Sequence, residues 1–410
     1  MTLIQIMLVS APLVGILLAL QASVATDASY KDAPLASLEQ RVATIEAKLE
    51  QLAHFSLRGG IGAIGCRSAG HLDPECTEWF EIDLEETFTI DEIVLVPTLW
   101  RDTEKGFQAD GFPLEFRIVA GTDDNPTGSV IVEHPQSKAV LPRIAPLVIP
   151  ITKTRASWLR IEAIRLSPRA FDGLHAFQLA EFLAFSGPDN VGLRCPVKAS
   201  STTPDIVGAW NPSYLVDGFT PYLMDSAQGS QSLAYVSIFS EKATLILDLG
   251  QPYPLSRIHL HAVDQSDTVP QAHAGDLGMP HHLRIEGADS PDFSDATTLL
   301  NVLRKDIYET GPIMMWRIGE QNCRFVRLVV EEPDNPLESS TGKFRLGFAE
   351  IELFSKGTNV ALNKLPQTNA TITGPKRSLS SLTDGNNLYG RILPVRKWVE
   401  QLSQRHDLET

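Results

Sequence analysis

Several features are missing from this chain of 410 residues, and each absence narrows what the protein can do. No Lys- or Arg-rich run is present, and the formal net charge is −15. Because binding to a nucleic-acid backbone needs clustered cations, the composition argues against that class of partner. The sequence also has no GxSxG elbow, HExxH motif or P-loop. These are common signatures of hydrolases, metalloproteases and nucleotide-binding enzymes.

Cysteine is scarce as well. The chain has four, Cys66, Cys76, Cys195 and Cys323, and none of them forms a CxxC motif. A cysteine-based zinc site is therefore not expected. An even count in an exported chain predicts disulfides, with Cys66 bonded to Cys76 and Cys195 bonded to Cys323. The alternative is four buried free thiols, which pack as small apolar side chains.

The first 25 residues form an apolar run that ends in Ser23-Val24-Ala25. Such a run, with small residues at its end, is typical of a secretory signal peptide. A membrane anchor is the alternative, because the run approaches the roughly 20 residues that span a bilayer. Either interpretation predicts a protein that is secreted, periplasmic or on the cell surface.

Residues 32–54 are predicted to form a short, coiled-coil-like helix, with Asp32 as its cap and Pro34 in its first turn. Its apolar residues alternate at spacings of three and four, and they are Leu35, Leu38, Val42, Ile45, Leu49 and Leu52. This seam predicts a homo-oligomer formed through residues 35–52. The alternative is a single helix that packs on the next domain, because sustained coiled coils usually show more heptads.

The rest of the chain contains a long repeat. Residues 243–263 read ATLILDLGQPYPLSRIHLHAV, and their alternating apolar residues predict two half-buried strands on either side of a turn. Residues 78–96 show the same alternation, and three further blocks recur in the same order at offsets between 165 and 169 residues. We interpret the repeat as a tandem duplication of one all-β domain, at residues 59–187 and 189–356.

A third copy begins but does not continue. The NVGLR of residues 190–194 recurs as NVALN at residues 359–363, and the LVDG that follows the first recurs as LTDG after the second. No further strand pattern follows, and residues 394–408 have helical spacing instead. The sequence therefore predicts a partial third repeat and a helical tail at residues 357–410. Two interpretations of this end stay open: a fragment of a longer protein, or a tail that pairs with another molecule.

The order of these blocks resembles the discoidin family, the coagulation-factor (F5/8) type C domains with a galactose-binding-like fold. LVDG, LDLG, RFVRL and FAEIELF follow one another within residues 190–356, and residues 60–187 match more loosely. The resemblance implies a mainly β protein with two tandem jelly-roll sandwiches. It also implies a non-catalytic module that binds carbohydrate or a cell-surface glycan through loops at one end.

Many carbohydrate-binding relatives hold a structural calcium between the DG loop and the Glu of the late AE pair. The matching positions are Asp217 and Glu350, so the resemblance implies a calcium site in the second sandwich, with hard oxygen ligands. The alternative is that Asp217 caps the turn at Gly218 and that Glu350 pairs with an arginine such as Arg327. A metal is less expected in the first domain, because no LVDG precedes its core.

Sugar sites in this family use loop aromatics together with a few polar side chains, because an apolar ring face stacks on a sugar while hydroxyls take directed hydrogen bonds. The candidate ligand-binding residues are Trp100, Arg101 and Asp102 in the first domain, and Trp210, Tyr214 and Tyr222, with Phe219, near the DG loop of the second. For each aromatic residue the alternative is a place in the sandwich core.

Histidines cluster in one part of the second domain, where His259 and His261 share a strand face. Because Arg257 is on the same face, we expect an outward polar face there and not a metal site. Taken together, the sequence predicts an exported, non-catalytic binding protein. Two alternatives stay open: the extracytoplasmic sensor region of a membrane receptor such as a histidine kinase, and the accessory binding region of a glycoside hydrolase.

Overall fold

The computed structural model describes residues 35–57, 64–102, 104–141, 143–203, 209–230, 234–263, 278–303, 313–333, 342–373 and 377–410. The apolar run of residues 1–25, together with Asp32 and Pro34, lies outside the described residues. No helix within those ranges is long and apolar enough to cross a membrane. Of the described residues, those from 53 to 403 form one compact unit, and residues 35–52 with 404–410 form another.

Helix α2, Leu35–Leu49, lies inside the range predicted for the N-terminal helix and belongs to the smaller unit. None of its residues is buried, and Leu35 is 72% exposed. Within the same unit, the Arg405 guanidinium donates to the Leu49 carbonyl at 2.9 Å. Of the predicted seam, Leu35 is exposed, Leu52 is buried and the other four residues are part-exposed. The oligomer that the seam predicts stays a prediction.

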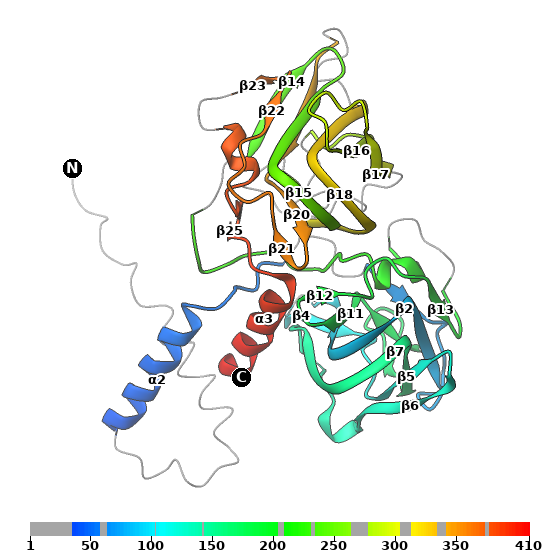
Figure 1. The fold of residues 1–410 in the computed structure, drawn as a ribbon. Coiled ribbons are helices and arrows are strands. Elements are labelled where there is room, and N and C mark those ends of the chain that lie inside the picture. Colours follow the sequence, from blue (N-terminus) through cyan, green and yellow to red (C-terminus); the bar gives the residue numbers. More distant parts are fainter. Residues whose placement is uncertain are drawn as a thin grey trace, which may run out of the picture. The chain divides into compact units, whose positions relative to one another are not determined.

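The first sandwich is built around two long antiparallel strands, β2 (Glu78–Val96) and β7 (Leu147–Arg165) (Figure 1). The strand order is β12-β11-β2-β7-β5-β6, and β13 pairs with β2. The remaining strands of this sheet are β5 (Glu115–Thr122), β6 (Asn125–His134), β11 (Glu181–Ser186), β12 (Asp189–Asn190) and β13 (Val197–Ala199). Three short pairs complete it: β1 (Cys66–Arg67) with β10 (Gln178–Leu179), β3 (Thr98–Asp102) with β4 (Gly106–Asp110), and β8 (Ser167–Pro168) with β9 (His175–Ala176).

The seven-stranded sheet of the second sandwich repeats that of the first strand for strand. Its sheet has the order β17-β16-β18-β15-β20-β21, with β22 on β15, which is the order of the first sheet read from its other edge. The strands are β15 (Thr244–His261), β16 (His282–Ala288), β17 (Thr297–Leu303), β18 (Ile313–Glu332), β20 (Glu350–Ser355), β21 (Thr358–Asn359) and β22 (Gln367–Thr368). The predicted tandem duplication of a β-sandwich is therefore confirmed.

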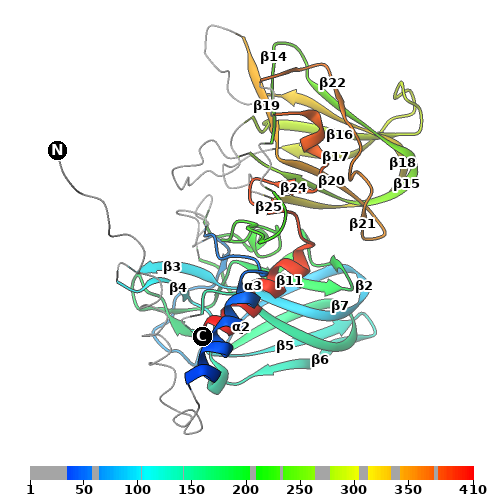
Figure 2. The same cartoon turned by 90° about the vertical axis from the view of Figure 1, so that its left-hand side faces the viewer.

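The smaller elements around the second sandwich include a three-stranded sheet of order β19-β14-β23 and a two-stranded pair, β24 with β25 (Figure 2). Their bounds are β14 (Tyr235–Phe239), β19 (Phe344–Phe348), β23 (Thr371–Ile372), β24 (Asn386–Asn387) and β25 (Gly390–Arg391). Three 3-10 helices, η3 (Gln136–Lys138), η4 (Pro212–Leu215) and η6 (Leu379–Leu382), and helix α3 (Val395–Glu409) complete the described elements. Helix α3 occupies the predicted helical tail.

The LDLG segment does not separate two strands as predicted. Strand β15 runs on through it and pairs with β18 on both sides, with a register shift between Asp248 and Tyr253. The Asp248 side chain accepts the Gly250 N–H at 2.8 Å, and Gly250 has a φ of +90°. The Pro/Gly segment is therefore a bulge that bends one long strand.

The predicted domain boundaries are wrong in one respect, because each sandwich is completed by the segment that follows it in sequence. Strand β13 pairs with β2 of the first sandwich, and Val191, Leu215 and Val216 belong to that sandwich's core. In the second sandwich, β22 pairs with β15, and Ala361 and Leu382 belong to the core. We call residues 189–219 and 358–385 the first and second closing segments.

Matching hydrogen bonds hold the two closing segments. The Asn190 side chain accepts the N–H groups of Ala184 and Gly192, at 3.1 and 3.2 Å. The Asn359 side chain accepts those of Leu353 and Ala361, at 3.2 and 3.1 Å. The predicted partial third repeat is thus the second closing segment, and it completes the second sandwich.

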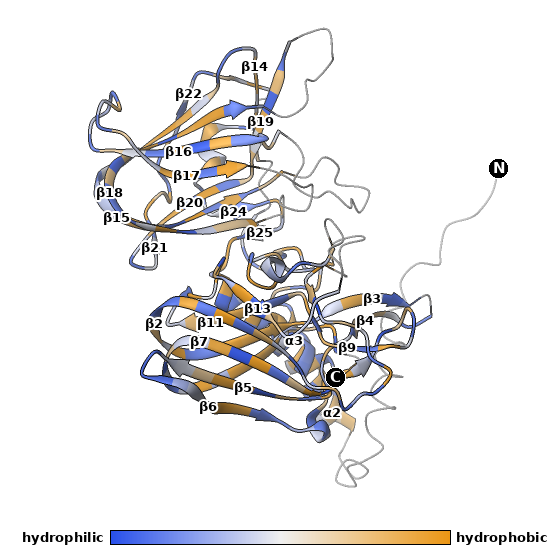
Figure 3. Ribbon diagram, turned by 90° about the vertical axis from the view of Figure 1, so that its right-hand side faces the viewer, coloured by the Kyte–Doolittle hydropathy of each residue, from blue (hydrophilic) through white to orange (hydrophobic). Residues whose placement is uncertain are grey.

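Apolar and polar residues alternate along the strands, as Figure 3 shows for β5 and β7. The inner residues of the first sandwich form a core that contains Phe80, Ile82 and Leu84 of β2. Its second face is also covered in part. Val94, Val96 and Leu183 pack in one cluster with Trp398, Val399 and Leu402 of α3. Two faces of β2 and β11 are therefore buried at this end of the sheet.

All four cysteines are free, so both predicted disulfides are wrong. Cys195 belongs to the core of the first sandwich and Cys323 to the core of the second, so the predicted partners lie in different cores. Cys66 is buried in the first core, and Cys76 packs against it as a part-exposed thiol. The open alternative of free thiols is the one that the structure shows.

Candidate ligand and metal sites

Two exposed aromatic side chains meet on neighbouring loops of the first sandwich. Trp100, on the β3–β4 hairpin, is 36% exposed, and Phe171, in the loop between β8 and β9, is 81% exposed. Their ring centroids are 6.5 Å apart with an interplanar angle of 58°. Among the described residues these two are the large aromatic side chains that are exposed. We call this pair the aromatic corner.

Polar contacts fix the two loops of the aromatic corner against each other. Asp110, at the end of β4, accepts the Ala170 N–H at 2.8 Å and the Gln178 side-chain amide at 3.0 Å. Arg169 and Asp172 form an ion pair inside the second loop. Since these bonds hold both loops in place, the apolar surface is preorganised.

The other two candidates on the hairpin have different roles. Side chains alternate along a strand, so Arg101 faces away from Trp100, and its guanidinium lies 5.8 Å from the Phe107 ring. Asp102 accepts the N–H groups of Glu104 and Lys105 at 2.7 and 2.8 Å, and these bonds lower its pKa. Asp102 therefore shapes the hairpin turn.

The aromatic candidates of the DG-loop region belong to the protein interior, which corrects their predicted role. Trp210 is 6% exposed and is stacked under the Arg67 guanidinium. Tyr222 is 1% exposed and its hydroxyl donates to the Ile144 carbonyl. Tyr214 is part-exposed and packs against Phe219 and its neighbours. Trp210 and Tyr222 cannot stack on a sugar, because no ring face is open.

The first DG loop binds to a buried glutamate of the first sandwich. Glu181 is fully buried, and its Oε1 accepts the Gly218 N–H and the Phe219 N–H, the latter at 3.0 Å. Its other oxygen, Oε2, has no hydrogen-bond partner among the described residues. Burial, followed by the neighbouring Asp217 carboxylate, raises the pKa of Glu181 well above its usual value. Asp217 also caps its own turn by accepting the Phe219 N–H at 2.8 Å.

The second DG loop repeats this arrangement. Glu350 Oε1 accepts the Gly385 N–H at 3.0 Å, and Oε2 is buried without a partner in the described part of the chain. Burial, reinforced by the charges of Glu352 and Asp384, raises the pKa of Glu350 to about 9. The expected pairing of Glu350 with Arg327 is wrong, because Arg327 pairs with Glu286.

The predicted calcium pair of Asp217 with Glu350 is therefore corrected, because the two residues belong to different sandwiches. The structure pairs Glu181 with Asp217 and Glu350 with Asp384. In each pair a buried carboxylate oxygen without a donor lies beside a second carboxylate. Carboxyl groups offer the hard oxygen ligands that calcium takes, and a bound calcium ion would displace the protons that burial favours on Glu181 and Glu350, so the residues present fit a calcium ion at each DG loop.

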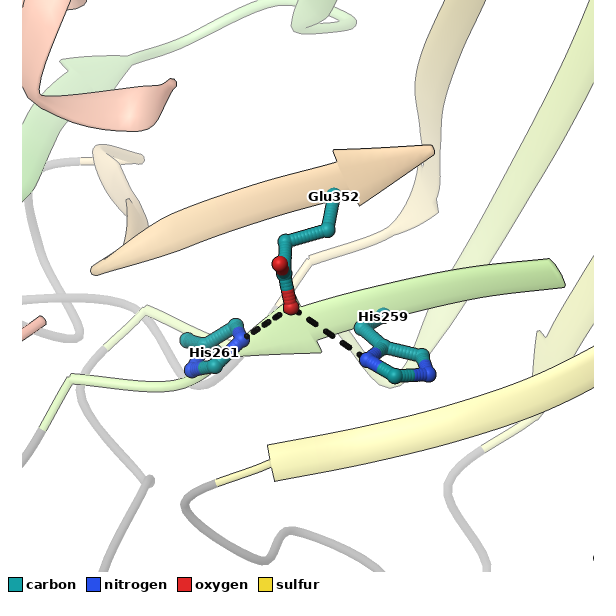
Figure 4. A group of neighbouring side chains, drawn as sticks. All are labelled: His259, His261 and Glu352. Carbon is teal, nitrogen blue, oxygen red and sulfur yellow. Dashed lines mark hydrogen bonds and ion pairs between the residues drawn. The ribbon is translucent and has the colours of Figure 1, made fainter. Parts of the chain in front are cut away.

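A third group of titratable residues links strands β15 and β20 of the second sandwich (Figure 4). Glu352 of β20 points its Oε2 at two imidazoles of β15, 3.3 Å from His259 Nδ1 and 3.0 Å from His261 Nε2. His259, His261 and Glu352 are 5%, 1% and 8% exposed. The expected outward polar face is therefore wrong, because all three side chains are buried.

The protonation of His259 and of Glu352 follows from different causes. Burial lowers the pKa of His259 to about 4, although Glu352 opposes the shift. Burial also works against ionisation of Glu352, but the hydrogen bonds to His259 and His261 outweigh it and hold the pKa of Glu352 below its usual range. The group is thus an ionised carboxylate held by two imidazoles.

No family model and no curated protein matches the sequence. Among solved structures, the paired modules CBM32-1 and CBM32-2 of ZmpB from Clostridium perfringens, in complex with GalNAc, are 13% identical and cover 72% of this chain and 85% of their own, with a TM-score of 0.23. A fucolectin from striped bass (Morone saxatilis) serum is 12% identical and covers 73% of this chain and 99% of its own, with a TM-score of 0.23.

A putative chitobiase fragment from Bacteroides thetaiotaomicron is 20% identical over 31% of this chain, and the match spans 63% of that fragment, with a TM-score of 0.19. These matches describe what the chain is similar to. The β-sandwich assignment itself rests on the strand order that the two halves of the chain share.

Sequence reasoning missed Phe171 and the partner of each DG loop. Phe171 lies in Arg169-Ala170-Phe171-Asp172-Gly173, where an aromatic residue stands among turn-forming residues; that signal could have identified it. No local signal links Glu181 to Gly218, because these residues are brought together only by the fold.

Proposed function

We propose that this protein is an exported, non-catalytic binding protein that holds a carbohydrate at the aromatic corner of the first sandwich. The observation that carries the proposal is the pair of Trp100 and Phe171, two exposed rings on loops that polar contacts fix in place. An exposed aromatic face costs free energy in water unless a ligand covers it, and a sugar presents a matching apolar face.

Polar groups for the hydroxyls of a sugar lie on the same two loops. Asp102 shares the hairpin face of Trp100, and Gln108 lies directly across from Trp100 on β4. Asp172 is in the loop of Phe171. Stacking on the rings with hydrogen bonds at the edge is the usual composition of such a site, with a few polar groups fixing the orientation.

We further propose a structural calcium ion at each DG loop, held by Glu181 with Asp217 and by Glu350 with Asp384. When bound, calcium would neutralise the paired carboxylates and fix the loop that completes each sandwich. Part of each loop's attachment does not depend on calcium, because Glu181 and Glu350 accept backbone N–H groups of the loops. The calcium sites are structural in this proposal and do not touch the aromatic corner.

A glycan array probed with the full chain tests the function. We expect binding to a limited set of glycans, and a loss of about 10-fold or more in affinity for Trp100→Ala and Phe171→Ala, because truncating a central aromatic contact typically costs this much. Leu303→Ala, which removes an exposed apolar side chain of the second sandwich, is the control and should bind normally. Equal signals on all glycans, or normal binding by both aromatic variants, would refute the proposal.

A further inference from the structure

We call His259, His261 and Glu352 the His-His-Glu cluster. These three polar residues stand at positions where the same fold can also hold apolar residues. Because the two sandwiches are copies, each position has a counterpart in the first. In β15 and β20, His259 pairs with Glu352 and His261 with Glu350. In β2 and β11, Val94 pairs with Leu183 and Val96 with Glu181.

The counterparts of the cluster are therefore Val94, Val96 and Leu183, all apolar and buried in the cluster that includes α3. The sandwich folds with three aliphatic side chains at these positions. The contacts of Glu352 with the two imidazoles offset part of the free-energy cost of burying polar groups there, but His259 Nε2 stays without a partner in the described part of the chain. Three aliphatic side chains would avoid that cost, so the exchange calls for a reason other than folding.

The geometry of the cluster matches a first coordination shell. Two ligands bound to zinc at 2.0–2.1 Å in tetrahedral geometry lie about 3.3 Å apart. The imidazole nitrogens of His261 and His259 lie 3.0 and 3.3 Å from Glu352 Oε2. One ligand atom from each of the three residues falls within 4.8 Å of the others. Among the described residues no other group of three such ligands does so.

Two further observations point to a ligand. The His259 side chain is 6% exposed, and Nε2, the ring nitrogen that does not face Glu352, has no hydrogen-bond partner in the described part of the chain, so this buried imidazole has an unsatisfied polar atom. All three residues also line a cavity of about 590 Å³, together with Arg257, Asn386 and other residues. An ion held by the cluster would therefore have coordination positions that face open space.

We propose that His259, His261 and Glu352 bind a divalent transition-metal ion of the zinc type, with at least one coordination position open to the cavity. Two histidines and one carboxylate are a ligand set used for zinc and for non-haem iron. The site is separate from the proposed calcium pairs, because its imidazole ligands suit a softer ion than calcium. The proposal does not depend on glycan binding.

The test is titration of the full-length, untagged and metal-stripped protein with zinc chloride, followed by calorimetry. The matched variant is His259→Val, His261→Val and Glu352→Leu together, which installs the residues of the first sandwich. We expect one zinc ion per chain for the wild type. The variant should lose more than about 100-fold in affinity, because even changes outside the first shell cost 10–100-fold. His282→Ala, a part-exposed histidine of the same sandwich, controls for surface binding and should be unchanged.

Circular dichroism and a cooperative melting curve establish that the triple variant is folded. Zinc X-ray absorption of the wild type needs no variant and should show two imidazole ligands and oxygen. If the wild type binds no zinc, if the folded triple variant binds it equally, or if no imidazole scattering is found, the proposal is overturned. In that case the cluster is only a hydrogen-bonded group.

Discussion

Replacing Glu181 by alanine should destabilise the first sandwich, because this side chain holds the first closing segment in place. The buried Gly218 N–H donates to Glu181 and would lose its acceptor, whereas the Phe219 N–H keeps the Asp217 side chain at 2.8 Å. A buried donor left unsatisfied costs about 1–3 kcal/mol. Adding the weakened second bond, we expect a loss of about 2–4 kcal/mol in the free energy of unfolding.

Glu181→Gln is the matched variant, because it retains an amide oxygen that can accept the Gly218 N–H. It also removes a carboxyl group whose pKa is raised by burial and by Asp217. We therefore expect Glu181→Gln to stay within about 1 kcal/mol of the wild type in the presence of a chelator.

Thermal unfolding followed by circular dichroism measures the difference. A change of 1 kcal/mol shifts the Tm of a domain of this size by about 2–4 °C, so Glu181→Ala should lower Tm by roughly 5–15 °C. The reasoning is refuted if the alanine variant melts with the wild type, or if glutamine costs as much as alanine.

Two further predictions concern metal and thiols. Calcium added to chelator-treated wild-type protein should raise Tm, because calcium at 100 times its Kd stabilises the folded state by about 2.7 kcal/mol. A double variant, Glu181→Gln with Glu350→Gln, should not respond. An unchanged wild-type Tm would rule out the calcium sites. In the native protein a thiol reagent should react quickly with one cysteine, the part-exposed Cys76, because burial raises the pKa of Cys66 and raises the pKa values of Cys195 and Cys323 to about 11. Cys76→Ser should abolish the fast phase, and two or more fast thiols in the wild type would contradict the burial of the other three.

The sequence predicted the duplicated β-sandwich well, because alternation and a constant offset are local properties that survive in each copy. The residue at which one copy of the repeat ends and the next begins could not be predicted in the same way. A periodic pattern has no marked origin, so the segment with LVDG can belong to the strands before it or after it. The choice is made by hydrogen bonds between distant residues, such as Glu181 with Gly218.

Some of the predicted ligand-binding residues are exposed and others are buried, and the sequence alone does not determine which. Trp100 lies in the middle of strand β3 and is 36% exposed, whereas Tyr222 is covered by Phe55 and Trp398. The alternation in β15 correctly placed His259 and His261 on one face. Whether that face meets water depends on residues far away in the sequence, such as Asn387, which contacts the His261 ring from 126 positions away, so its burial could not be foreseen.

The most direct test of the account compares two fragments of the second half of the chain. Residues 227–393 contain the strands of the second sandwich together with the second closing segment. Residues 189–356 are the second domain as the sequence analysis predicts it, without that segment. If each sandwich needs its own closing segment, the first fragment should show one cooperative thermal transition and the second should show none. A cooperative transition for residues 189–356 and its absence for residues 227–393 would contradict the account.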